Sequence, residues 1–283
     1  GSTVNVDGSI STAGRGYGSN NGPGVGQYCG FNIGTGGGGH GGYGGGCNGS
    51  LTGAGRGQPY GNGLDTFEFG SGGATHSYYG YVGGAGGGRI ELIATSQLTI
   101  GGSLDASGTD GNGSTSYQGA GGGSGGSIRI ESPTISGIGS LNARGGNGGP
   151  KSGGGGAGGR ISILASNVSG VLDTNAKPGC NGTSSSICAS TRGGAGTVYF
   201  AHTQTLRYDG NSGQSAPSPV APGSVKNIEV QGGASLLGDR PIVASGTLLV
   251  DNASYILGGS NPLIVSADDL ELAGSVVGGN VTV

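Results

Sequence analysis

The chain contains no methionine and no tryptophan, and it carries little charge. Its 283 residues include 12 basic and 15 acidic side chains, which gives a net charge of −3. Disorder in a chain this poor in apolar residues usually requires a high net charge, so the composition favours a packed protein. No apolar run approaches the roughly 18 residues that a membrane span needs. We therefore expect no membrane span, and we expect no nucleic-acid partner either.

Proline is also scarce. Only 10 prolines are present, far fewer than a collagen triple helix uses, and the 75 glycines occur in runs. Glycine thus makes up a share several times the usual ~7%, which is atypical of an ordinary enzyme domain. The first six residues already alternate like a strand, so we expect the chain to be processed or to be a piece of a longer protein.

Glycine is distributed unevenly, since 57 of the 75 glycines lie within residues 1–160. We predict three regions on this basis. Residues 1–210 are a glycine-rich β-solenoid with long excursions, and residues 211–223 are a connector rich in proline and serine. Residues 224–283 are solenoid rungs of about 20 residues without excursions.

The C-terminal region repeats with a period near 20. Gly238, Gly258 and Gly278 are 20 residues apart, and Val230 matches Val250. This period combines β-branched alternation with an absence of helix caps, which is typical of a β-solenoid.

The glycine-rich region repeats the same unit at wider spacing. Its strand cores centre on Ile90, Ile128, Ile161 and Val198, which are 38, 33 and 37 residues apart. A second apolar strand is predicted at Ile10, Leu104, Leu141, Leu172 and Leu206. The extra residues form four tracts, 15–88, 109–126, 146–158 and 177–195, which we expect to leave the solenoid at one corner and to stack on one side.

Glycines recur at every third place within these tracts, as at Gly119, Gly122 and Gly125. Polyproline II has three residues per turn, so this spacing presents an edge without side chains, along which extended segments can approach closely. The predicted fold is therefore all-β: a right-handed parallel β-helix, or β-solenoid, with glycine-rich excursions in polyproline II or irregular conformation packed on one flank. The alternative is that the tracts are flexible low-complexity loops.

The four cysteines form two local pairs, and we predict disulfides between Cys29 and Cys47 and between Cys180 and Cys188. Six Asn-x-Ser/Thr sequons are candidates for N-glycosylation: Asn48, Asn112, Asn167, Asn181, Asn252 and Asn280. Together these features favour a secreted protein in an oxidising setting. The alternative for the sequons is that Asn-Gly-Ser is simply common in loops of this composition.

No pattern predicts catalysis, a cofactor or a metal. His40, His76 and His202 have unrelated contexts, and we expect each at the surface or in a loop. The rung positions of Asp105, Asn142, Asp173 and Arg207 are interpreted as a solvent-facing column, and surface ion pairs are predicted between Glu91 or Glu131 and the nearby arginines Arg89, Arg129 and Arg160. We therefore expect no enzymatic activity.

Tyrosine is the main aromatic residue, and seven of its 11 copies lie in the first excursion: Tyr17, Tyr28, Tyr43, Tyr60, Tyr78, Tyr79 and Tyr81. Such rings are typical of intersubunit or adhesive surfaces, they can stack on sugars, and they can also simply fill gaps between glycine-rich segments.

The phrases at residues 84–90, 122–128 and 154–161 (GAGGGRI, GGSGGSI and GGGAGGRI) resemble the glycine-rich repeats of large secreted or cell-surface proteins of protists, algae and plants. This resemblance, similar in style to components of flagellar hairs and other extracellular appendages, implies a structural role. We therefore expect a subunit of an extracellular fibre, appendage or surface coat, which assembles by solenoid stacking and contacts of a Gly/Tyr-rich flank with copies of itself or with other fibre proteins. The alternative is a carbohydrate-binding adhesin or a polysaccharide-processing β-helix, with glycans as partners.

Overall fold

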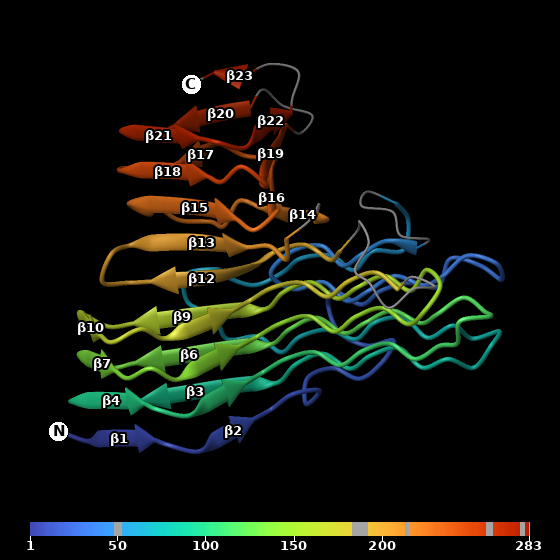
Figure 1. The fold of residues 1–283 in the computed structure, drawn as a ribbon, viewed down its shortest axis with the longest axis horizontal. Coiled ribbons are helices and arrows are strands. Elements are labelled where there is room, and N and C mark those ends of the chain that lie inside the picture. The colour runs from blue at the N-terminus through green and yellow to red at the C-terminus, as the bar shows by residue number, and fades with distance from the viewer. Residues whose placement is uncertain (48–52, 183–191, 213–214, 259–262, 278–280, 283) are drawn as a thin grey trace.

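The computed structural model describes residues 1–47, 53–182, 192–212, 215–258, 263–277 and 281–282. These residues form an all-β protein, and no α-helix occurs among them. Almost all strand pairs are parallel, and the strands lie one above another in successive tiers (Figure 1).

The N-terminal half contributes strands to three sheets. The first sheet contains β1 (Thr3–Val6), β4 (Gln97–Ile100), β7 (Thr134–Ser136) and β10 (Asn167–Ser169). The second contains β2 (Ser9–Ser11), β5 (Ser103–Asp105), β8 (Ser140–Asn142) and β11 (Asp173–Asn175). The third, which we call the long sheet, begins with β3 (Arg89–Ile93), β6 (Ser127–Glu131), β9 (Arg160–Leu164) and β12 (Gly196–Phe200).

The long sheet continues into the C-terminal half. It adds β13 (Thr205–Asp209), β15 (Asn227–Gln231), β18 (Thr247–Val250) and β21 (Asp269–Leu272). Beside it lie a sheet of β14 (Pro217–Pro219), β16 (Ser235–Gly238), β19 (Tyr255–Gly258) and β22 (Ser275–Val277), and a sheet of β17 (Ile242–Val243), β20 (Leu263–Ser266) and β23 (Val281–Thr282).

Equivalent apolar residues of successive tiers lie directly above one another. Ile90 pairs with Ile128, Ile128 with Ile161, and Ile161 with Val198, as the spacing predicted. The predicted alignment of Val230 with Val250 is confirmed too. Side chains on one face of each strand therefore form columns inside the stack.

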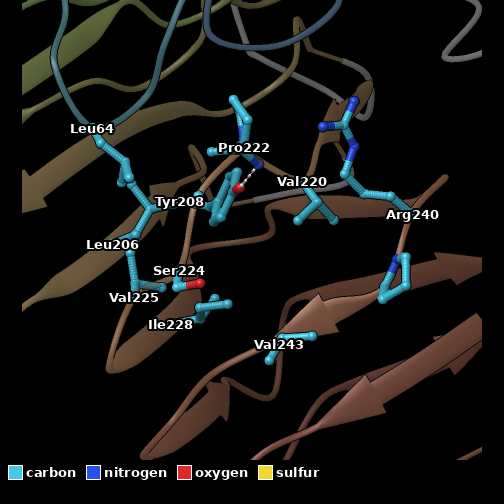
Figure 2. Close-up of a pocket in the computed structure, with 13 residues that line it drawn as sticks. Leu64, Leu206, Tyr208, Val220, Pro222, Ser224, Val225, Ile228, Arg240 and Val243 are labelled. Atoms are coloured by element: carbon cyan, nitrogen blue, oxygen red, sulfur yellow. Dashed lines mark hydrogen bonds between the residues drawn. The ribbon is translucent and has the colours of Figure 1, made fainter.

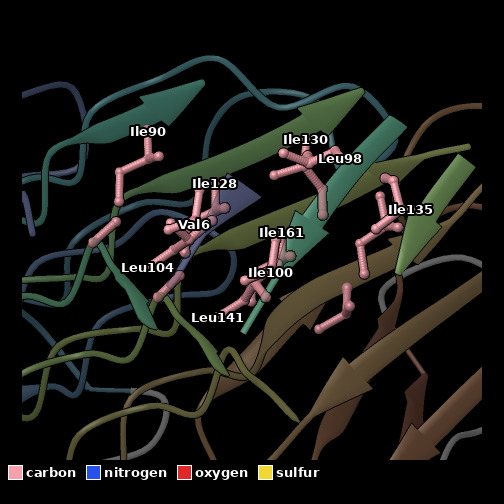
Figure 3. Packing of buried hydrophobic residues seen from close by; sticks show 14 of the residues in the cluster. Val6, Ile90, Leu98, Ile100, Leu104, Ile128, Ile130, Ile135, Leu141 and Ile161 are labelled. Carbon is pink, nitrogen blue, oxygen red and sulfur yellow. The ribbon is translucent and has the colours of Figure 1, made fainter. Parts of the chain in front are cut away.

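These columns form the hydrophobic core of the N-terminal half. Ile128, Ile161, Leu98 and Leu104 are completely buried and meet from three different sheets (Figure 3). Full burial of such a side chain contributes about 1.5–3 kcal/mol to the stability of the folded protein. A few buried side chains in each tier therefore stabilise the stack. A second hydrophobic cluster fills the C-terminal half, and the two clusters meet at β12 and β13.

The glycine-rich tracts leave the strands on one side of the stack (Figure 1). Each tract lies between a strand of the second sheet and the next strand of the long sheet, for example between β5 and β6 or between β8 and β9. The prediction that the excursions share one corner is therefore confirmed for these tracts.

Backbone hydrogen bonds within this layer repeat with a period of three. In the segment 119–126, the N–H groups of residues 119, 122 and 125 donate to one neighbouring segment, those of 120, 123 and 126 to a second, and those of 121 and 124 to a third, at 2.8–3.2 Å. The acceptor carbonyls, in the same order, belong to Lys151, Gly154 and Ala157, then Asn112, Thr109 and Ala106, and finally Ala74 and Ser71. Three faces per turn match the three-residue period of polyproline II, and buried peptide groups are thereby satisfied.

The structure corrects the predicted role of Leu206. This residue lies in β13, which pairs with β12 in antiparallel orientation, so the chain reverses between Phe200 and Thr205. Leu206 therefore does not extend the column of Ile10, Leu104 and Leu141, which are paired in β2, β5 and β8. Leu172 is also misaligned, because Leu141 pairs with Thr174.

The structure differs from the sequence prediction at two further places. Strands β4, β7 and β10 join β1 in a further sheet that the two-strand repeat did not include. The predicted connector 211–223 contains β14, which pairs with β16. Ser218 of β14 is buried. The proline-rich stretch is thus part of the C-terminal stack.

Candidate functional site

The most distinctive surface lies at the turns of the glycine-rich excursions. One turn is closed by a β-bridge between Tyr28 and Thr35, and a second by a β-bridge between His76 and Tyr81. A third segment, from the excursion between β5 and β6, adds Tyr117. We call the rings gathered here the aromatic cluster: Tyr28, Phe31, His76, Tyr78, Tyr79, Tyr81 and Tyr117.

Tyr79 is at the centre of the aromatic cluster. Its ring centroid lies 4.7 Å from that of Tyr117, 4.8 Å from His76 and 5.0 Å from Tyr78. Phe31 stands edge-on to Tyr78 with centroids 4.3 Å apart. Aromatic pairs at these separations attract each other beyond the effect of buried area alone.

The outer rings of the cluster face solvent. The exposed fraction is 64% for Tyr78, 51% for Tyr117, 47% for Phe31 and 41% for Tyr28. A contiguous exposed group of large aromatic side chains is uncommon at a protein surface, which makes the aromatic cluster the candidate functional site.

The turns that carry these rings are held in place by the backbone. The Thr35 hydroxyl donates to the Ala74 carbonyl at 2.9 Å, which joins the first turn to the second. The Asn112 N–H donates to the Val82 carbonyl at 2.9 Å, which joins the second turn to the excursion that carries Tyr117. The rings are therefore presented on a network of fixed peptide groups rather than on separate loops.

Two groups of the aromatic cluster have pKa values shifted toward their uncharged forms. The His76 side chain is buried, and burial lowers its pKa from the usual value. The pKa of Tyr79 is raised by burial and by the neighbouring tyrosines Tyr78 and Tyr117. A ligand would consequently meet ring faces and phenolic hydroxyl groups.

All three histidines lie outside the named strands, as expected for histidines at the surface or in loops, but two of them are not accessible to solvent. His40 and His76 are completely buried, whereas His202 is exposed. His40 stacks on Tyr60 with centroids 4.8 Å apart, and the Gly125 carbonyl lies 2.8 Å from its Nδ1. Burial, followed by the charge of Arg160, lowers the pKa of His40 to about 3.

The prediction of a surface ion pair for Arg160 is also wrong, because this side chain is buried. Its guanidinium donates to the carbonyls of Tyr60 and His40 and to the Thr197 hydroxyl at 2.9–3.3 Å. Arg160 therefore fastens the first excursion to β9 and β12. Chains as glycine-rich as this give no sequence signal for such a long-range contact.

Arg129 makes the ion pairs that the alternation predicted. Its guanidinium contacts Glu91 at 3.3 Å and Glu131 at 2.6 Å, and it also contacts Asp65 of the first excursion at 2.7 Å. Arg89 instead lies over the ring of Phe67, 3.7 Å from its centroid.

The predicted polar column is only partly correct. Asp105 pairs with Asn142, but Asn142 pairs with Asn175 rather than Asp173. Arg207 belongs to the long sheet and not to this column.

A pocket of about 390 Å³ lies between the first excursion and the C-terminal stack, where Leu64 faces Leu206 and Val225 (Figure 2). The Tyr208 hydroxyl in this pocket accepts a hydrogen bond from the Ala221 N–H at 2.8 Å and donates one to the Pro219 carbonyl at 3.3 Å. Burial raises the pKa of Tyr208 to about 12. The pocket is thus lined mainly by apolar side chains around a hydroxyl whose hydrogen bonds are made.

The predicted disulfide between Cys29 and Cys47 is confirmed. Cys180 is disulfide-bonded as well. Its expected partner Cys188 lies outside the described residues, so that pairing stays a prediction.

The sequons fall into three groups. Asn112, Asn167 and Asn252 are exposed, and glycosylation there stays a prediction. Asn181 is 4% exposed, and its Oδ1 accepts a hydrogen bond from the Gly155 N–H at 2.6 Å, so we expect no glycan at this position. Asn48 and Asn280 lie outside the part of the chain that the structure describes.

Across the described ranges, no group of three or more His, Cys, Asp or Glu side chains is arranged to hold a metal ion. Within the same ranges, no helix is long and apolar enough to cross a membrane.

No protein-family model matches the chain, and neither a curated protein nor a solved structure has significant similarity to it.

Proposed function

We propose that the protein is a secreted carbohydrate-binding adhesin in which a β-solenoid and its glycine-rich layer act as a rigid support for the aromatic cluster. The observation that carries this proposal is the exposure of Tyr78, Tyr117, Phe31 and Tyr28 on one connected group of rings. The solenoid interpretation is supported by the strand register, which repeats in three sheets in each half; among the described strands, β12 and β13 are the exception, because they pair in antiparallel orientation. The disulfide fits an oxidising environment.

Carbohydrate suits this surface for chemical reasons. The faces of aromatic rings are electron-rich and attract the polarised C–H groups of a sugar ring, and phenolic hydroxyl groups add hydrogen bonds at the edges. The uncharged state of His76 and Tyr79 favours a neutral ligand over an ionic one. Because the turns are already ordered by backbone bonds, binding would cost little conformational entropy.

A glycan array with purified protein tests this proposal. We expect binding to a defined set of saccharides, and a loss of at least tenfold in apparent affinity in Tyr78→Ala and Tyr117→Ala. Phe67→Ala is the matched control, because Phe67 is an equally exposed aromatic of the first excursion that lies outside the cluster. An array without binding, or an equal loss in the control, would overturn the proposal.

The second candidate is a subunit of an extracellular fibre or surface coat, as the resemblance to glycine-rich appendage proteins implies. Strand β3 favours it, because within the described residues β3 pairs only with β6 and leaves its outer edge unpaired, and its Ile93 is 55% exposed. Such an edge can pair with another chain. The glycine tracts are already hydrogen-bonded to one another. Contacts between the flanks of neighbouring subunits would therefore be made by the tyrosines.

Fibre formation has a geometric consequence. Strands β3 and β21 run in opposite directions because the chain reverses at β12 and β13. Head-to-tail contacts between copies would therefore join β21 to β3 in antiparallel orientation. Electron microscopy of the purified protein over a concentration series distinguishes the candidates, since regular filaments support a fibre subunit and persistent monomers oppose it.

A further inference from the structure

We propose that Tyr79 and Tyr117 are a site of oxidative cross-linking, at which a haem peroxidase with hydrogen peroxide joins the two rings into a dityrosine. Their ring centroids lie 4.7 Å apart with the ring planes inclined by 31°, the closest tyrosine pair of the aromatic cluster. A carbon–carbon bond between two phenol rings holds the centroids only slightly closer. The two rings are therefore already close to the centroid separation of a coupled pair.

The pair joins two separate parts of the glycine-rich layer. Tyr79 belongs to the turn between His76 and Tyr81, and Tyr117 belongs to the excursion between β5 and β6. The segments already contact each other through the Asn112 N–H, which donates to the Val82 carbonyl. A covalent bond here would fasten the exposed end of the layer, in the way that the disulfide between Cys29 and Cys47 fastens the first turn.

Access for the oxidant is provided by Tyr117, whose exposed fraction is 51%, and by Tyr78, whose exposed fraction is 64%. Tyr78 also contacts Tyr79, with centroids 5.0 Å apart. A radical formed on an outer ring can therefore pass to Tyr79 by electron and proton exchange within the cluster. No charged group needs to move for this step.

One cross-link consumes one molecule of hydrogen peroxide. Each phenol loses one electron and its hydroxyl proton, which yields two phenoxyl radicals. The radicals couple through ring carbons next to the oxygen-bearing carbons, and each of these two carbons then returns its hydrogen to a phenolic oxygen. Two tyrosines lose two hydrogen atoms in total, and hydrogen peroxide takes them up to become two molecules of water.

Other tyrosine pairs of the cluster would not have the same effect. Tyr78 and Tyr79 are adjacent in the chain, and Tyr79 and Tyr81 lie on one turn, so a bond within either pair would link nothing that is not already joined. Tyr79 and Tyr117 are 38 positions apart in the sequence. Only their bond would connect two excursions.

Peptide mapping tests the proposal directly. Dilute protein is treated with haem peroxidase and hydrogen peroxide, digested with trypsin and examined by mass spectrometry. Trypsin yields the peptides 57–89 and 90–129, and Tyr117 is the only tyrosine in the second. We expect these two peptides to appear as one species, lighter than their sum by two hydrogen atoms, together with dityrosine fluorescence.

Three variants define the site. Tyr117→Phe removes the coupling hydroxyl while keeping the ring, so it should abolish the joined species, and Tyr79→Phe should do the same. Tyr17→Phe is the control, because Tyr17 is 39% exposed and, among the described residues, its aromatic ring contact is with Phe69 and not with another tyrosine. This variant should cross-link like the parent protein.

The peptide maps of these variants test the cross-link between Tyr79 and Tyr117 independently of glycan binding. A joined species that persists in Tyr117→Phe, or cross-links found only between separate molecules at dilute concentration, would overturn the proposal. So would cross-linking that is equally weakened in Tyr17→Phe. Loss of the joined species in Tyr117→Phe and Tyr79→Phe alone supports it.

Discussion

Gly123 lies directly against the backbone of Ala85, so close that a Cβ on Gly123 would be 2.1 Å from the Ala85 carbonyl oxygen and 2.4 Å from its carbon. Both atoms belong to a neighbouring segment of the same glycine-rich layer, and neither is the end of a flexible side chain. The separation of these segments is therefore set by the absence of side chains.

We expect Gly123→Ala to destabilise the protein by about 1–3 kcal/mol or more, because the added methyl group must push two backbone segments apart. Urea unfolding followed by circular dichroism measures the effect. Gly18→Ala is the control, since a Cβ there meets no atom within 4 Å, and we expect a change of less than about 0.5 kcal/mol. Equal stability of the two variants would show that the layer tolerates side chains.

The core columns lead to a second prediction. Ile161 is completely buried between Ile128 and Val198, so Ile161→Ala should lower the free energy of unfolding by about 2–5 kcal/mol. Ile138→Ala removes the same atoms from a side chain that is 79% exposed, and should change stability by less than about 0.5 kcal/mol. A comparable loss of unfolding free energy in both variants would contradict the placement of Ile161 in a buried column.

Strand spacing allowed much of the stack to be predicted from sequence. Ile90, Ile128 and Ile161 could be aligned because alternation fixes which face of a strand is buried, and a shift by one residue would expose the whole column. The three-residue period of the glycines likewise predicted that the excursions approach one another closely, and backbone hydrogen bonds with the same period join them.

The reversal at β12 and β13 could not be predicted in this way. The apolar alternation of Val198 and of Leu206 is the same whichever direction the strand runs, so periodicity does not reveal orientation. The turn at residues 201–204 also lacks the Asn-Gly or Asp-Gly pair that usually marks a hairpin. Gln204 instead adopts a φ of 51° there.

The aromatic cluster was only partly visible in the sequence. The sequence shows the tyrosine enrichment of the first excursion, but Tyr117 lies in another excursion and no sequence pattern singles out Phe31. Their assembly depends on hydrogen bonds between backbone groups of different excursions, which no side-chain pattern encodes.

The disulfide supports a third prediction. Cys29 and Cys47 close a loop with a sequence separation of 18, and a cross-link of this length stabilises a protein by about 3 kcal/mol, chiefly by restricting the unfolded chain. The double variant Cys29→Ser with Cys47→Ser should therefore lower the free energy of unfolding by about that amount in urea titrations. An unchanged unfolding midpoint would show that the first turn is held by its backbone bonds alone.

His40 gives a prediction of pH dependence. The pKa of His40 is lowered to about 3 in the folded protein, whereas an unfolded histidine titrates near ~6.5, so between these values only the unfolded state binds the proton. The stability that depends on neutral His40 is fully present above about pH 6.5 and is lost as the pH falls toward 3, with a slope of up to about 1.4 kcal/mol per pH unit.

Urea unfolding at pH 7.5, 6.0 and 5.0 tests this, with His40→Gln as the key variant. Glutamine can still donate to the Gly125 carbonyl but does not titrate, so the decline in stability between pH 7.5 and 5.0 should become shallower by the contribution of one proton. His76, whose pKa is also lowered by burial, should account for part of the remaining decline. An identical slope in His40→Gln and the parent protein would mean that His40 binds its proton equally well in the folded and unfolded states.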